Sequence, residues 1–205
     1  NIQGEPTWFT IRVSAAGYTA RPARVPVLVA LISRTAGADL ADLPAGGICL
    51  YPGDGPWRPE RDDVTLIPLP VKTLVAAGGF EPRMRDYGAN MVYVGALAAM
   101  LGIELDELRA ALAHHFKGKA RPVEQNFAVI QAAHDWFRAE RPGDCQSRYR
   151  LERRERREDQ ILIDGNTASA LGAIFGGVSF VAWYPITPAT SLAHAPLHYL
   201  PRLRR

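Results

Sequence analysis

Apolar residues in the first third of the chain follow two patterns, each typical of a β-strand. Phe9, Ile11 and Val13 alternate with polar residues, which predicts a half-buried strand followed by a turn at Gly17. Three continuous apolar runs come next, as expected for strands inside a sheet that helices cover. They span residues 25–32 (VPVLVALI), 48–51 and 64–69. This part of the chain predicts an α/β domain with a mixed or parallel sheet.

A helical period replaces the strand pattern in the middle of the chain. Residues 90–101 are expected to form a helix that ends at Gly102, and two more helices are expected at 106–116 and 123–137. Each of these two has one apolar face, made of Leu105, Leu108, Leu112 and Phe116 in the first and of Phe127, Ile130 and Phe137 in the second. The three helices should form a layer that closes the sheet. His134 lies on the inner side of its helix, where a hydrogen-bonded structural histidine is expected.

An abrupt change of composition divides the chain into parts. Residues 1–140 form the first domain, and residues 141–160 are predicted to be a charged linker that contains the run RYRLERRERRED. Glutamates alternate with arginines in this run, which allows pairs such as Glu152 with Arg156 and favours a solvated linker over a nucleic-acid patch. Residues 161–193 begin a second α/β domain. Residues 194–205 contain two prolines and no apolar period, so they are predicted to be a disordered tail.

The second domain contains the candidate site. A helix is expected after Gly165, with Asn166 or Thr167 as its cap, and the apolar run Val178–Tyr184 is expected to be a strand. A Pro-flanked turn, residues 184–188 (YPITP), follows this strand, and a helix should begin at Ala189. Ligands of α/β sheets bind at the carboxyl ends of strands, next to the helices that follow. The turn is therefore the predicted location of a functional site.

Composition and charge indicate a globular protein and argue against membrane-spanning, nucleic-acid-binding and disulfide-rich classes. The chain is 47% hydrophobic and 22% charged, as in globular domains, and it has no apolar run long enough to span a membrane. The formal net charge is +3, and three arginines of the tail account for all of it. The rest of the chain is neutral, so no nucleic-acid partner is expected. Two cysteines form no disulfide framework and suit a reducing cytoplasm. Because an iron–sulfur cluster takes four cysteine ligands, any such cluster must belong to a partner.

Two motifs that suggest metal binding have simpler interpretations. Gly53-Asp54-Gly55 lies among prolines and predicts a turn rather than a site for the magnesium ion of a diphosphate. His194 and His198 have the spacing of a helical zinc pair, but no third ligand is evident and Pro196 is expected to interrupt the helix. No metal site is predicted.

The sequence of residues 161–193 (ILIDGNTASALGAIFGGVSFVAWYPITPATSLA) resembles the opening of the thiamine-dependent α subunit of 2-oxoacid:ferredoxin oxidoreductases. In that family a GN-x-A-x-ALGA helix leads through a strand to a YPITP turn. The resemblance implies a thiamine-binding domain of the pyrimidine type, in which Thr187 contacts the substrate beside thiamine diphosphate. The cofactor-binding residues are otherwise unknown, with Tyr184, Pro185, Ile186 and Pro188 as the candidates. Ala189 departs from the family, where serine is usual.

The preceding residues resemble the γ domain of the same enzymes, in the form where γ is fused ahead of α. The segments TWFTIRVS, GANMVYVGALAAMLGI, FKGK and VEQNFAVI carry this likeness. It implies a β subunit as partner, thiamine diphosphate and magnesium in the assembled enzyme, and clusters on a partner. The implied reaction converts a 2-oxoacid and coenzyme A to acyl-CoA and CO2 and reduces ferredoxin. The order of γ before α resembles the 2-oxoglutarate type.

Two other functions stay open at the level of sequence. The family's γ domain begins with a glycine-rich turn that is missing here, and its α subunit continues for several hundred residues. The chain is therefore expected to be a fragment that is inactive by itself. The alternative is that the chain is a non-catalytic assembly module derived from this subunit. An unrelated nucleotide-binding domain would need a G-x-G-x-x-G after a strand, and the sequence contains none.

Overall fold

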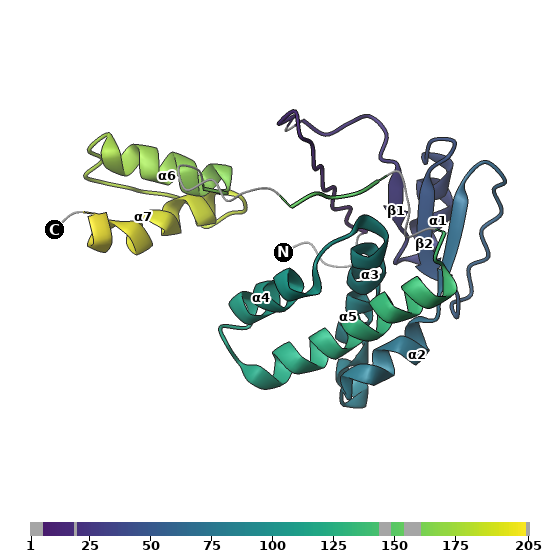
Figure 1. The fold of residues 1–205 in the computed structure, drawn as a ribbon. Helices are drawn as coiled ribbons and strands as arrows, with labels where there is room; N and C mark the ends of the chain where they lie inside the picture. Colours follow the sequence, from purple (N-terminus) through teal and green to yellow (C-terminus); the bar gives the residue numbers. More distant parts are fainter. Residues whose placement is uncertain (1–5, 19, 144–148, 154–160, 204–205) are drawn as a thin grey trace. The chain divides into compact units, whose positions relative to one another are not determined.

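The chain folds into two compact units. A computed structural model describes residues 6–18, 20–143, 149–153 and 161–203, and the units comprise Asn1–Arg153 and Arg154–Arg205 (Figure 1). The division falls inside the segment predicted to be a linker, residues 141–160.

A three-stranded parallel sheet forms the centre of unit 1. Its strands are β1 (Val27–Val29), β2 (Ile48–Pro52) and β3 (Thr65–Leu69), in the order β1-β2-β3. Helix α1 (Ser33–Ala41) connects β1 to β2. The three apolar runs of the sequence are thus confirmed as strands, and the sheet is parallel.

Helices complete unit 1 in the order that the apolar periods predict. They are α2 (Val71–Val75), α3 (Arg85–Leu101), α4 (Leu105–His115) and α5 (Ala120–Glu140), with 3-10 turns at Ala76–Gly78 and Pro82–Met84. Helix α3 ends at Gly102, which has a φ of 75°, a conformation that glycine adopts without a steric penalty. The helical layer is therefore confirmed, with α3 beginning five residues earlier than expected, at Arg85.

The core of unit 1 lies on both faces of the sheet. On one face, β2 and β3 pack against α3 and α5, where Leu50, Ile67, Val92 and Phe137 are fully buried. On the other face, α1 packs against Cys49, whose pKa burial raises to about 11. A sheet covered on both sides explains why its strands are continuous apolar runs rather than alternating ones.

Helices α3 and α5 approach each other closely at Gly95. A β-carbon at this position would meet the carbonyl oxygen of Ile130, and it would lie 2.8 Å from the β-carbon of Ala133. Only a residue without a side chain lets the two backbones come so near. The glycine therefore sets the distance between the two longest helices of the unit.

The strand predicted at residues 9–13 is wrong. The segment runs extended but joins no sheet in the described residues, and the side chains of Phe9, Ile11 and Val13 are 90%, 72% and 67% exposed. An alternating pattern becomes a strand only when a neighbouring strand accepts its hydrogen bonds. The turn predicted at Gly17 is confirmed, since its N–H donates to the carbonyl of Ser14 at 3.2 Å.

Part of the predicted linker is attached to unit 1. The N–H of Leu151 donates to the carbonyl of Leu101 at 2.8 Å, and Arg153 pairs with Glu104 at 2.7 Å and with Glu107 at 2.9 Å. The pair expected between residues 152 and 156 lies outside the described residues. Leu151 and Arg153 of the charged run are thus bound to the end of α3 and to the start of α4.

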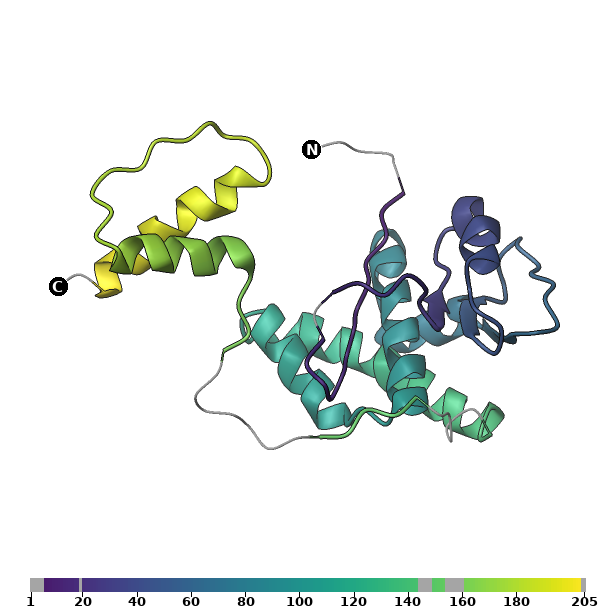
Figure 2. The same cartoon turned by 90° about the horizontal axis from the view of Figure 1, so that it is seen from above.

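Unit 2 is a helical hairpin. Helices α6 (Gly165–Phe175) and α7 (Ala189–Leu203) lie side by side and are joined by a long connection (Figure 2). Helix α6 ends before Gly176-Gly177, as expected from the sequence. The strand predicted at Val178–Tyr184 is wrong, because no described strand of unit 2 offers a ladder with which the segment could pair.

The disordered tail predicted at residues 194–205 is also wrong for the described residues, because α7 continues to Leu203. Two prolines, Pro196 and Pro201, lie inside this helix. Each removes one backbone hydrogen bond. Pro196 and Ala193 are nevertheless buried, and α7 packs against α6, where Ala170 and Ile174 are buried. We infer that this packing outweighs the local cost of the prolines.

Among the helices of the described residues, none combines the length and the apolar character that a membrane crossing requires.

Candidate functional site

The turn Tyr184–Pro188 is held in a defined conformation at the start of α7. The N–H of Ile186 donates to the carbonyl of Tyr184 at 2.8 Å, and the N–H of Thr190 donates to the carbonyl of Ile186 at 3.2 Å. The peptide bond between Thr187 and Pro188 is cis. The predicted site residues therefore lie together in one compact turn.

Asn166 connects this turn to the beginning of α6. Its amide nitrogen donates to the carbonyl of Pro188 at 2.9 Å and to the hydroxyl of Ser191 at 2.7 Å. The hydroxyl of Ser191 in turn donates to the carbonyl of Pro188 at 3.2 Å. Two segments that lie 22 residues apart in the sequence are thus joined by a single side chain. Sequence reasoning treated Asn166 only as a capping residue and missed this connection.

Asp164 caps α6, so the cap predicted at Asn166 or Thr167 is wrong. One carboxylate oxygen of Asp164 accepts the N–H of Thr167 at 2.9 Å, and the other accepts its hydroxyl at 2.6 Å. The side chain of a capping residue usually accepts the N–H of the residue two or three positions after it. The sequence signal was present as D-x-x-T at residues 164–167. Hydrogen bonds from the side chain and the backbone of Thr167 lower the pKa of Asp164.

The lowered pKa of Asp164 makes the start of α6 sensitive to acid. The cap contributes stability above about pH 4, the unfolded pKa of aspartate, and this contribution is lost as the pH falls through the lower folded pKa. We expect hydrogen exchange of the α6 amides, corrected for intrinsic rates, to lose protection in that range. Asp164→Asn is the matched control because asparagine caps but does not titrate. Equal acid sensitivity in both proteins would assign the loss to other carboxylates.

Thr187 lies in a fixed turn, but its side chain has no hydrogen-bonding partner among the described residues. Its side chain is exposed, and its hydroxyl makes no hydrogen bond with any residue that the structure describes. Tyr184 and Ile186 beside it are 75% and 56% exposed. Trp183 instead packs edge-on against His194 with the ring centres 5.8 Å apart. The turn thus leaves one hydroxyl and several apolar side chains exposed at the surface of unit 2.

The residues present do not form a complete pocket for a diphosphate cofactor. All five residues of the turn are exposed, and no cluster of three metal-ligating side chains occurs within the described ranges. His194 packs against Trp183, and His198 packs edge-on against Tyr199. The turn by itself therefore encloses no cofactor.

Asp54 has a structural role, which confirms the turn predicted at Gly53-Asp54-Gly55. Its carboxylate accepts the N–H of Lys72 at 2.6 Å at the start of α2, and the N–H of Gly53 donates to Leu69 at 2.9 Å. A side chain on Gly53 would lie 2.7 Å from Pro68. The carboxylate is therefore used to hold the carboxyl ends of β2 and β3 together.

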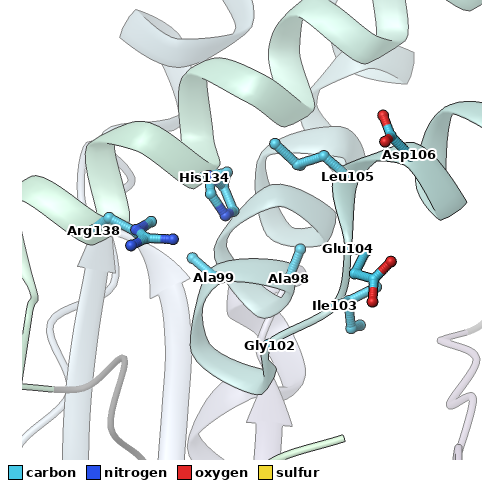
Figure 3. A pocket seen from close by; sticks show the side chains of 9 residues that line it. All are labelled: Ala98, Ala99, Gly102, Ile103, Glu104, Leu105, Asp106, His134 and Arg138. Atoms are coloured by element: carbon cyan, nitrogen blue, oxygen red, sulfur yellow. The ribbon is translucent and has the colours of Figure 1, made fainter. Parts of the chain in front are cut away.

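A hollow of about 420 Å³ lies in unit 1, where the end of α3 faces α5. The ring of His134 lies above Ala98 and Ala99, with Arg138 beside it (Figure 3). The Nδ1 of His134 is 3.1 Å from a carboxylate oxygen of Asp135, whose pKa is lowered by hydrogen bonds from Gln131 and then from His134. The hydrogen bond expected of His134 is thus present, and its structural role stays a prediction.

Comparison with known proteins gives a consistent result for both units. The family described as pyruvate ferredoxin/flavodoxin oxidoreductase matches residues 1–136. Subunit alpha of 2-oxoacid:ferredoxin oxidoreductase 2 from Aeropyrum pernix is 24% identical over 234 residues, which cover 94% of this chain and 36% of that protein. The 2-oxoglutarate oxidoreductase subunit KorA from Mycobacterium tuberculosis is 25% identical and covers 83% of this chain and 30% of its own length. The chain spans about a third of these relatives.

A solved structure is similar to the chain in fold as well as in sequence. It is the 2-oxoglutarate:ferredoxin oxidoreductase from Magnetococcus marinus with 2-oxoglutarate, coenzyme A and succinyl-CoA bound. The two chains are 27% identical with a TM-score of 0.69, and the match covers 86% of this chain and 30% of the other.

Proposed function

Because the chain belongs to the pyruvate ferredoxin/flavodoxin oxidoreductase family, we propose that it forms the γ domain and the beginning of the α domain of a 2-oxoacid:ferredoxin oxidoreductase. In this assignment unit 1 is the γ domain and unit 2 begins the thiamine-dependent domain. The enzyme converts a 2-oxoacid and coenzyme A to acyl-CoA and CO2 and reduces ferredoxin. The Magnetococcus relative, which holds 2-oxoglutarate, favours a 2-oxoglutarate type.

The observation that carries the proposal is the exposed hydroxyl of Thr187 on a fixed turn. A side chain that binds substrate must be both positioned and free of other partners. The bonds from Asn166 to Pro188 and Ser191 fix the turn, and Thr187 uses none of its hydrogen-bonding capacity within the described part of the chain. We propose that this hydroxyl donates a hydrogen bond to an oxygen of the bound 2-oxoacid.

Other parts of the assembled enzyme complete the site in this proposal. Thiamine diphosphate supplies the stabilised carbanion that decarboxylation of a 2-oxoacid requires. This cofactor and its magnesium ion are held mainly by residues outside the described turn, with Tyr184, Pro185, Ile186 and Pro188 as contacts at its edge. A β subunit contributes to the site, and the iron–sulfur clusters lie on a partner. The free, buried thiol of Cys49 agrees with a reducing cytoplasm.

Exposed apolar side chains in unit 2 support an assembly with other subunits. Phe175 and Phe180 are 76% and 81% exposed, and Leu197 is 67% exposed. Residues 165–201 contain no Asp, Glu, Lys or Arg. Large apolar side chains that are exposed in a segment without charges are characteristic of contacts that become buried. A non-catalytic assembly module would have the same property, so activity has to separate the two functions.

The test is an anaerobic assay of the protein that carries this sequence, tagged in its own cell and purified with its accompanying subunits. We expect reduction of methyl viologen that depends on both coenzyme A and a 2-oxoacid, with 2-oxoglutarate preferred over pyruvate. A complex that contains the β subunit but reduces no dye with either acid would favour the assembly module. Turnover with pyruvate alone would correct the substrate type and keep the family reaction.

A further inference from the structure

The connection between α4 and α5 is a rigid turn. The N–H of Gly118 donates to the carbonyl of Ala113 at 2.8 Å, that of Lys117 to His114 at 3.2 Å, and that of Lys119 to Phe116 at 3.1 Å. Lys117 and Gly118 both have positive φ values, 52° and 72°. Consecutive backbone hydrogen bonds of this kind close the end of a helix and fix the direction in which the next one begins. The side chains on this turn are therefore carried by a fixed backbone.

The turn concentrates positive charge without acidic neighbours in the sequence. Residues 108–123 contain no Asp or Glu. Lys117, Lys119 and Arg121 are exposed, and none of them pairs with a carboxylate among the residues that the structure describes. His114 and His115 are exposed beside them. We call residues 114–121 the basic turn.

The cation nearest to the basic turn in the sequence, Arg109, already has partners. The guanidinium of Arg109 binds Glu124 at 2.6 Å and lies 4.0 Å from the ring centre of Phe127. Glu124, the first acidic residue after the turn, is thereby directed toward α4 and its charge is balanced. The charges of Lys117, Lys119 and Arg121, which lie within five residues of the chain, are balanced by no carboxylate among the residues that the structure describes. A surface of this kind attracts an opposite charge over about 10 Å at moderate salt.

We propose that the basic turn is a docking surface for an acidic face of a partner protein. Three cations on a rigid, exposed turn provide positive charges at fixed spacing, and electrostatic complementarity steers such a partner to one orientation. The proposal concerns a surface of unit 1 only. It does not depend on the function proposed for the Thr187 turn.

Other anionic partners fit the basic turn less well. A nucleic acid is held through many phosphates and, when single-stranded, through stacked bases. The basic turn offers only three permanent cations, and its one aromatic residue outside the histidines, Phe116, is half-buried. A small phosphate compound is held in a concave site. No residue of the basic turn lines the hollow beside His134 or a second hollow, of about 400 Å³, that lies between Arg24 and Asp63.

A labelled peptide of ten glutamates tests the proposal by fluorescence anisotropy with the intact chain. Lys117→Glu/Lys119→Glu should bind this peptide about tenfold more weakly, because two attractions are replaced by two repulsions. The control is Arg21→Glu/Arg24→Glu, which changes the net charge equally at two exposed arginines of the same unit. We expect the control to bind within about twofold of the unchanged chain, and added salt to weaken binding.

Three results would overturn the proposal. The first is an equal loss of affinity in both double variants, which would show that only net charge matters. The second is a single-stranded DNA oligonucleotide of equal charge that binds the basic turn more tightly than the peptide. The third is displacement of the peptide by micromolar inorganic pyrophosphate, which would indicate a phosphate site. Circular dichroism of both variants checks that unit 1 stays folded.

Discussion

Gly95→Val should destabilise unit 1 by about 3 kcal/mol or more, the upper end of the cost of overpacking a core. The new side chain would meet the carbonyl oxygen of Ile130 and the β-carbon of Ala133, and the N–H of His134 lies 3.1 Å from the position of the β-carbon. Two of these three atoms belong to the backbone of α5 and cannot rotate away. The helices α3 and α5 would have to separate, which exposes apolar surface on both.

The midpoint of denaturation in urea, followed by circular dichroism, measures this effect. Gly37→Ala is the matched control, since Gly37 lies inside α1 and a β-carbon there would meet nothing within 4 Å. Alanine should raise the stability by about 0.5–1 kcal/mol, because glycine is the poorer helix former. Equal midpoints for Gly95→Val and the unchanged chain would show that α3 and α5 do not approach each other closely at Gly95.

Thr187→Val should lower kcat/KM for the 2-oxoacid by about tenfold, or about 1.4 kcal/mol, in the assembled enzyme. Valine has nearly the shape of threonine but lacks the hydroxyl, so it removes the proposed hydrogen bond and leaves the turn intact. The bonds of Asn166 to Pro188 and Ser191 do not involve this side chain. Light scattering of the variant complex should therefore show unchanged assembly.

Thr187→Ser provides the control because it retains a hydroxyl at the same position. We expect it to keep most of the activity that Thr187→Val loses. If both variants turn over like the unchanged enzyme, Thr187 is only a turn residue. If Thr187→Val fails to assemble, the side chain has a packing role. Recovery of activity in the serine variant separates chemistry from packing.

Continuous apolar runs predicted the three strands of the sheet, because helices cover both of its faces and no polar face is left on the strands. The alternation at residues 9–13 is equally regular and yet forms no strand. The run at residues 178–184 fails for the same reason, since a strand depends on a partner that its own sequence does not specify. Local pattern thus predicts which residues can form a sheet better than which of them do.

The helix that continues through Pro196 shows the limit of local rules in the other direction. Proline disfavours a helix interior by about 3 kcal/mol, and this cost is visible in the sequence. The compensating contact with α6 joins residues about twenty positions apart. Residues 194–205 were expected to have no apolar period, but apolar residues do recur every three or four positions from Ala189 to Leu203, and this helical period was the signal that could have indicated α7. Packing against α6 therefore makes this segment helical although the helix propensity of its prolines indicates that the helix should end.

The candidate site was partly predictable. The position of the turn followed from a strand-like run that ends at Tyr184 and from the prolines that bracket Thr187. The role proposed for Thr187 rests on family resemblance, because an exposed threonine has no chemical signature of its own. The bond from Asn166 to Pro188 spans 22 residues, and no spacing rule indicates it.

Asn166 also determines how the Thr187 turn can be transplanted. The position of Thr187 depends on an amide at the start of α6 and on a carboxylate, Asp164, that fixes that start. A designer who copies only the five residues YPITP into another scaffold would move the hydroxyl without its support. The smallest portable unit is the whole of residues 164–191, which contains both Thr187 and the side chains that hold its turn.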